Sequence, residues 1–190
     1  MDFPVYKLKI NPNIEGASEV TAVALVDLPA IQEDFQFFNL HKQKYKIENE
    51  EQRIISGPLM IADKPIYREN DEFGSHYIVF DADTIKTIAI KYAKKKYQSN
   101  VNEMHETPLA GIVLFESFIS DTKRGIKPMV GYEDAPDGSW FGSMYIENEQ
   151  VWQDVKEGKF KGFSVEGLFI YDVPKKTDEE ILNSLKKLLS

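Results

Sequence analysis

Residues 161–173 read Lys-Gly-Phe-Ser-Val-Glu-Gly-Leu-Phe-Ile-Tyr-Asp-Val, and this stretch is typical of a β-strand. Side chains alternate between the two faces of a strand, so Phe163, Val165 and Phe169 share one face. Ser164 and Glu166 share the other face. A serine adds little to the stability of such a strand. Its presence is explained if a basic residue elsewhere in the chain takes its proton.

The chain offers few residues for that task. It has three histidines, His41, His76 and His105, and His105 in Asn-Glu-Met-His-Glu is the candidate base. The pair of Ser164 and His105 predicts a serine hydrolase, although only the tertiary fold can bring the two residues together. The Gly-x-Ser-x-Gly elbow of α/β-hydrolases is not present, because Glu166 stands where its second glycine belongs.

The composition limits the class of protein. With 190 residues and 42% hydrophobic residues, the chain is long enough for one domain with a substantial core. The net charge of −8 argues against binding to nucleic acid, and the apolar runs are too short for a transmembrane helix. The N-terminal residues lack the pattern of a secretion signal. The absence of cysteine excludes disulfides and thiolate chemistry and fits a reducing cytosol.

Periodicity predicts a mainly β, α+β fold with a few flanking helices. The predicted strands are Val5–Ile10, Val20–Leu28, Ile54–Ile61, Tyr77–Phe80, Leu109–Ile119, Trp140–Glu147 and Lys161–Val173. The predicted helices are Thr84–Tyr97 with Asp83 as its N-cap, Glu149–Glu157 after Asn148, and an amphipathic helix at Asp178–Leu189. Residues 121–138 are predicted to form a long surface loop, while residues 33–50 fit either a strand or a charged linker.

We expect no metal and no cofactor. His105-Glu106 begins like a zinc-protease motif, but that motif needs a histidine at the position of Leu109. The glycines Gly162 and Gly167 do not form a phosphate-binding loop of the Walker type.

Glu116 is an acid within the most apolar segment, Leu109–Ile119. An unpaired charge in a buried strand would be costly, so a buried Glu116 needs a partner, and an imidazolium would serve. Alternatively, Glu116 faces solvent on an edge strand and has no such role. The residues alone leave both readings open.

Several segments together resemble the bacteriophage prohead (procapsid maturation) serine proteases, in particular the XkdF-like group. The segments that carry the resemblance, in chain order, are 24–30 (ALVDLPA), 57–61 (GPLMI), 66–68 (IYR), the predicted helix at 83–97, 102–106 (NEMHE), 116–119 (ESFI), 138–140 (GSW), 151–152 (VW) and 161–167 (KGFSVEG). Each segment alone is a weak signal, but their order and spacing together are fairly specific.

The resemblance implies a compact β-barrel with flanking helices, similar to the herpesvirus assemblin proteases, over residues 1–173, followed by a helical tail at 174–190. It also implies that Ser164 is the nucleophile and His105 the general base. For the third catalytic residue it favours Glu116, with Glu166 as the runner-up and Glu106 after that. The family's usual His-Asp step is His105-Glu106 in this chain.

The implied function is a serine endopeptidase that cleaves scaffold and major capsid proteins, and sometimes itself, during procapsid maturation. Its place would then be the host cytoplasm, inside the immature procapsid, and self-association within the shell is expected. The alternative is a non-catalytic structural or minor capsid component that retains the protease fold.

Overall fold

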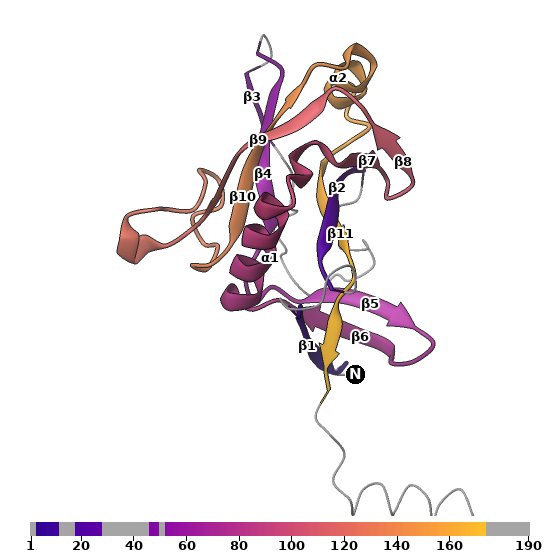
Figure 1. The fold of residues 1–190 in the computed structure, drawn as a ribbon, viewed down its shortest axis with the longest axis vertical. Coiled ribbons are helices and arrows are strands. Elements are labelled where there is room, and N and C mark those ends of the chain that lie inside the picture. The colour runs from indigo at the N-terminus through magenta and orange to yellow at the C-terminus, as the bar shows by residue number, and fades with distance from the viewer. Residues whose placement is uncertain (1–2, 12–17, 28–45, 50–51, 174–190) are drawn as a thin grey trace, which may run out of the picture.

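The computed structural model describes residues 3–11, 18–27, 46–49 and 52–173. In this part of the chain, strands far outnumber helices and are arranged in three four-stranded sheets (Figure 1). The mainly β, α+β class is therefore confirmed. The predicted helix at 178–189, the whole tail at 174–190, His41 and most of 33–50 lie outside the described residues.

The β10 sheet has the strand order β3-β4-β10-β9, and all its neighbouring strands are antiparallel. The prediction of one buried strand over 109–119 was wrong. Gly111, with a φ of +74°, separates a short strand ending at Leu109 from the longer β9. β9 is an edge strand, and its middle, from Phe115 to Ser117, is exposed. The strands of this sheet are β3 (Lys46–Asn49), β4 (Ile54–Met60), β9 (Ile112–Ile119) and β10 (Trp140–Ile146).

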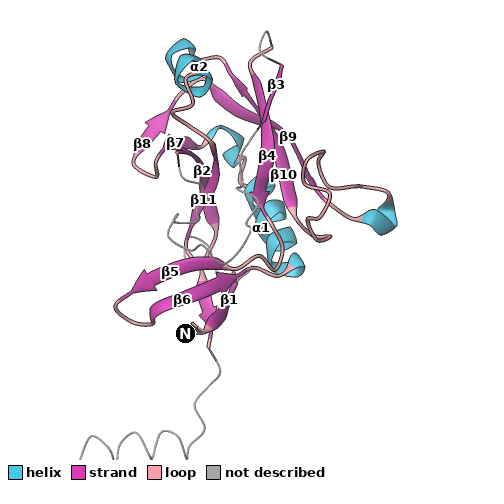
Figure 2. Cartoon of the chain, turned by 180° about the vertical axis from the view of Figure 1, so that it is seen from behind, coloured by secondary structure: helices cyan, strands magenta, loops and turns pink. Residues whose placement is uncertain are grey.

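The β2 sheet has the order β11-β2-β7-β8, so that β11 is an edge strand beside β2. β11 pairs with β2 antiparallel, whereas β7 pairs with β2 in parallel. Its four strands lie side by side in Figure 2. Their bounds are β2 (Val20–Val26), β7 (Val101–Glu103), β8 (Thr107–Leu109) and β11 (Gly162–Gly167).

The β1 sheet has the order β12-β1-β6-β5 and lies below the other two sheets in Figures 1 and 2. Its strand β12 continues the segment that we predicted as one strand over 161–173. That prediction was wrong at the middle, because the chain leaves the β2 sheet after Gly167 and joins the β1 sheet at Ile170. The strands are β1 (Val5–Lys9), β5 (Ile66–Asn70), β6 (Gly74–Val79) and β12 (Ile170–Asp172).

Both described α-helices follow the predicted patterns closely. α2 (Glu149–Lys156) begins after Asn148, whose side chain accepts from the Val151 backbone N–H at 3.1 Å, as predicted. α1 (Ala82–Lys94) is capped by Asp81 and not by the predicted Asp83, because the Asp81 carboxylate accepts from the Thr84 backbone N–H at 2.9 Å. Two short 3-10 helices, η1 (Tyr97–Ser99) and η2 (Thr122–Arg124), complete the described helices.

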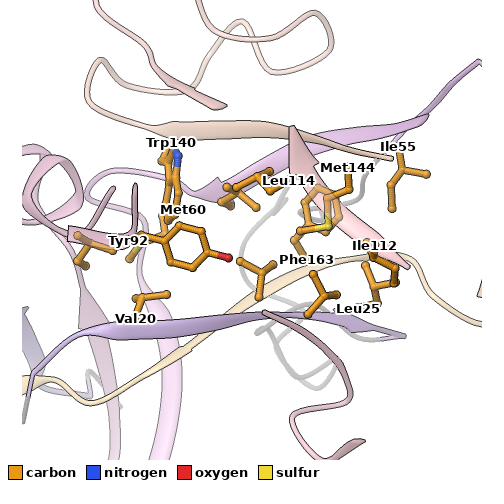
Figure 3. Close-up of a cluster of buried hydrophobic side chains, with 14 of the residues drawn as sticks. Val20, Leu25, Ile55, Met60, Tyr92, Ile112, Leu114, Trp140, Met144 and Phe163 are labelled. Atoms are coloured by element: carbon orange, nitrogen blue, oxygen red, sulfur yellow. The ribbon is translucent and has the colours of Figure 1, made fainter. Parts of the chain in front are cut away.

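The main core lies between the β2 sheet and the β10 sheet, with α1 along one side (Figure 3). Leu25 and Phe163 from the β2 sheet face Met144 and Leu114 from the β10 sheet, and Tyr92 of α1 contacts Trp140. The β2 and β10 sheets pack face to face through these apolar side chains. The opposite face of the β2 sheet is not part of this core and can carry polar side chains.

No single closed barrel joins the three sheets among the described strands, in contrast to the assemblin-like expectation. The chain passes from the β2 sheet to the β1 sheet through residues 168 and 169, where Leu168 N–H donates to Glu19 O at 3.0 Å.

Gly138 holds the start of β10 against the start of α1. Its φ is +91°, and a Cβ at this position would lie 2.3 Å from the Ala82 Cβ. Gly138→Ala should lower the free energy of unfolding by about 2–5 kcal/mol, from the left-handed conformation and overpacking together. Gly131→Ala is the control, because Gly131 has a φ of +90° but open space around it. Equal losses in urea titrations of the two variants would show that the contact with Ala82 contributes nothing.

Candidate active site

Ser164 lies in the middle of β11, on the face of the β2 sheet turned away from the main core. The residue is 8% exposed, and its Oγ lies 3.0 Å from Nε2 of His105. The predicted pair is therefore brought within hydrogen-bonding distance by the fold. If Oγ donates to Nε2, the neutral ring carries its proton on Nδ1, which is the tautomer a general base requires.

His105 lies at the tip of the hairpin that joins β7 to β8. The turn has two central residues, Met104 with φ +52° and His105 with φ +64°, and Glu106 N–H donates to Glu103 O at 2.9 Å. This is the pattern of a type I′ turn, which normally carries Asn-Gly because left-handed backbone is costly for other residues. The left-handed backbone of Met104 and His105 therefore lowers the stability of the protein. Backbone strain of this kind is typical of functional positions.

Glu166 supplies an acid on the far side of the histidine ring. Its Oε2 lies 3.4 Å from Nδ1 of His105, and its side chain is 41% exposed. The same oxygen accepts a hydrogen bond from Asn102 Nδ2 at 2.5 Å. Ser164, His105 and Glu166 therefore lie in the order hydroxyl, imidazole and carboxylate that nucleophilic catalysis by serine needs.

Asn102 links the acid to the turn that carries the base. Its Oδ1 accepts from the backbone N–H of His105 at 3.2 Å, while its Nδ2 donates to Glu166. The sequence signals this role of Asn102 only through the family resemblance, which includes the segment 102–106.

Glu116, the acid that the sequence analysis favoured, is not part of this arrangement. It lies on β9 opposite Ser143 and is exposed, and no ion pair or hydrogen bond joins it to His105 among the described residues. β9 is an edge strand with an exposed middle, so of the two readings of Glu116 the structure shows the solvent-facing one. Glu106 is exposed at the turn, and none of the described contacts brings its carboxylate to His105.

Two small residues of β2 make room for the site. Ala24 pairs with Ser164 on one side and with Asn102 on the other, so that the three residues form a row across one face of the sheet. Ala22 pairs with Glu166 in the same way. Larger side chains at these two positions would lie between the strands that carry the site.

A cleft of about 370 Å³ opens beside the Ser164–His105 pair. It lies between β11, β4 and one face of the β1 sheet, and apolar side chains make up most of its wall. Arg68 is the only lysine or arginine among the described residues that line it. The lining side chains beyond the site are Leu8, Leu59, Met60, Ile61, Ile66, Arg68, Ile78, Phe80, Val165, Leu168, Phe169 and Tyr171.

A wider depression of about 510 Å³ lies on the β10 sheet around Phe115 and Tyr145, away from the pair. The described residues contain no cluster of three or more histidine or acidic side chains able to hold a metal ion. Among the helices that the structure describes, none is long and apolar enough to cross a membrane.

A family model matches residues 44–170 of the chain, about two thirds of its length, and its family is described as "Putative phage serine protease XkdF". The chain belongs to this family. The matched residues include the β7–β8 hairpin with His105 and the strand with Ser164 and Glu166. Comparisons with curated proteins and with solved structures gave no match. The XkdF family thus supports a hydrolase of the serine protease class, and the relation to the assemblins stays a prediction.

Proposed function

We propose that this protein is a serine endopeptidase, with Ser164 as nucleophile, His105 as general base and Glu166 as the acid that orients the base. The observation that carries the proposal is the 3.0 Å approach of Ser164 Oγ to His105 Nε2, with Glu166 at the other ring nitrogen. Membership in a phage serine protease family supports the same reaction class.

The reaction follows from this geometry. His105 Nε2 takes the proton of Ser164 as Oγ attacks the carbonyl carbon of the scissile peptide bond. The negative Glu166 stabilises the imidazolium that forms. The tetrahedral intermediate then collapses, the imidazolium gives its proton to the leaving amine, and an acyl group remains on Ser164. A water molecule, deprotonated by His105, releases the acyl group as a carboxylic acid and restores the hydroxyl.

The substrates proposed are the scaffold and major capsid proteins of the same phage, cleaved within the immature procapsid in the host cytoplasm, and self-association and self-cleavage belong to this proposal. An assemblin-like arrangement of the catalytic pair is also part of it, supported by a serine on β11 and a histidine in the turn after β7, because both strands flank β2.

The direct test is to incubate the purified protein with those phage proteins and to identify fragments by mass spectrometry. Defined fragments support the endopeptidase. Intact substrates, together with no labelling of Ser164 by a fluorophosphonate even in assembled particles, would favour the non-catalytic structural component instead.

A further inference from the structure

One face of the β1 sheet forms the wall of the cleft opposite Ser164. Residues that pair directly share a face, so the register places Ile66 with Ile78, and Leu8 with Tyr171, on the same side of the sheet. Arg68 follows Ile66 by two positions and so lies on this face too. Arg68 pairs directly with His76, which is buried on the same face, and among these residues Arg68 is the one with a permanent positive charge.

The guanidinium of Arg68 is partly withdrawn from water. Burial lowers the pKa of Arg68 below its ordinary value, while the neighbouring Tyr171 acts in the opposite direction. Its Nη1 donates to the carbonyl oxygen of Tyr67 at 2.8 Å, which fixes one end of the group. A partly desolvated guanidinium attracts a carboxylate more strongly than one in bulk water does.

The positive charge of Arg68 contrasts with the negative charge of the chain as a whole. The chain carries a net charge of −8, so an acidic segment of a substrate is repelled by the protein as a whole. Inside the cleft, Glu166 adds a further negative charge beside the catalytic pair. An acidic side chain can therefore enter favourably only where a local cation receives it.

We propose that Arg68 is a specificity-determining residue, which binds the carboxylate of an aspartate or glutamate of the substrate near the scissile bond. The apolar wall of the same cleft takes a neighbouring apolar side chain of that substrate. This inference rests on the proposed function, because it places the substrate in the cleft that Arg68 and Ser164 both line.

The experiment uses binding, so it does not depend on turnover. Immobilised Ser164→Ala protein is exposed to a synthetic library of randomised decapeptides, and the retained peptides are sequenced. Asp or Glu should be enriched roughly tenfold or more at one position, beside an apolar residue, as expected for a charge-assisted hydrogen bond. The double variant Ser164→Ala/Arg68→Gln should lose the acidic enrichment and keep the apolar one.

Arg124→Gln on the Ser164→Ala background is the matched control, because it removes one positive charge from the exposed loop at 121–138. It should leave the acidic enrichment unchanged. The role of Arg68 is overturned if the acidic enrichment persists in Ser164→Ala/Arg68→Gln, or if Ser164→Ala itself shows no acidic enrichment. Failure of the proposed function is detected separately: a fluorophosphonate then does not label Ser164, and the parent protein does not cleave the phage proteins.

A second inference comes from the hydrogen bonds around the turn. Asn102 contacts both the backbone of His105, in the turn after β7, and the carboxylate of Glu166 on β11, which lies on the other side of β2. We infer that Asn102 is a positioning residue, which holds Glu166 against Nδ1 of His105 and keeps the strained turn in place.

Asn102→Ala should slow fluorophosphonate labelling of Ser164 by roughly 10- to 100-fold, in the rate of the chemical step and not in probe affinity. The nitrogen chemical shifts of the His105 ring should also change, because the tautomer with the proton on Nδ1 is no longer favoured by a fixed carboxylate. Asn100→Ala is the control, since Asn100 donates to Thr21 O nearby without touching the site. Unchanged ring shifts and labelling in Asn102→Ala would make Asn102 a structural residue only.

Discussion

Ser164→Ala should abolish cleavage of the phage proteins, with a loss of about 10⁴-fold or more, and should remove all labelling by fluorophosphonates. The reason is that Oγ is the only atom removed, and it is the atom that His105 Nε2 approaches at 3.0 Å. The variant should fold as the parent does, because alanine fits the space of a serine and the neighbouring pairs of β11 with β2 are untouched. Fragment analysis by mass spectrometry provides the measurement.

Ser143→Ala is the matched control for this experiment. Ser143 is a second buried serine in the middle of a strand, and its Oγ contacts only Ser56 Oγ, at 2.9 Å, among the described hydrogen bonds. It should keep full cleavage activity. If Ser164→Ala cuts as well as the parent, the nucleophile has been assigned wrongly.

Glu166→Gln should reduce turnover by about 10²- to 10⁴-fold while the protein stays folded. Glutamine has nearly the same size, but it has no negative charge to stabilise the imidazolium of His105 that forms as Ser164 attacks. Side-chain exposure of 41% shows that folding does not depend on burying this residue. Rates are measured on a defined substrate fragment, under conditions where the parent enzyme is saturated.

Glu116→Gln distinguishes the two assignments of the acid. Because Glu116 is exposed on β9 and lies in another sheet, this change should leave turnover within about twofold of the parent's. A large loss of turnover in Glu116→Gln, together with a small loss in Glu166→Gln, would instead identify Glu116 as the acid that orients His105.

The sequence predicted the position of Glu166 on its strand, but not the exposure of Glu116. The alternation of side chains along 161–173 placed Glu166 on the same face as Ser164, and the structure has it there. The preference for Glu116 came from the family resemblance, because the apolar character of its segment left open whether Glu116 is buried or faces solvent. Whether a strand is central or at an edge depends on pairing with distant segments, and here the edge position exposes Glu116.

Local patterns predicted the two described α-helices, because apolar spacing is a short-range signal, although α1 is capped by Asp81 and not by the predicted Asp83. They did not predict the turn at His105. Met-His lacks the Asn-Gly signature of a type I′ turn, so the sequence gives no hint of the left-handed backbone found there. Local patterns also missed the break between β11 and β12, where Gly167 lies against the backbone of Glu19, a residue far away along the chain.

The row of Ser164, Ala24 and Asn102 across the β2 sheet also has a consequence for the newly made chain. β11 emerges from the ribosome after β1 to β10, and it must then pair with β2, which was synthesised long before. Pairings between such distant segments form late, because the loop between them must close first. A chain in which β11 has not yet paired with β2 therefore lacks the candidate pair, and the hydroxyl and the imidazole meet only when this sheet is complete.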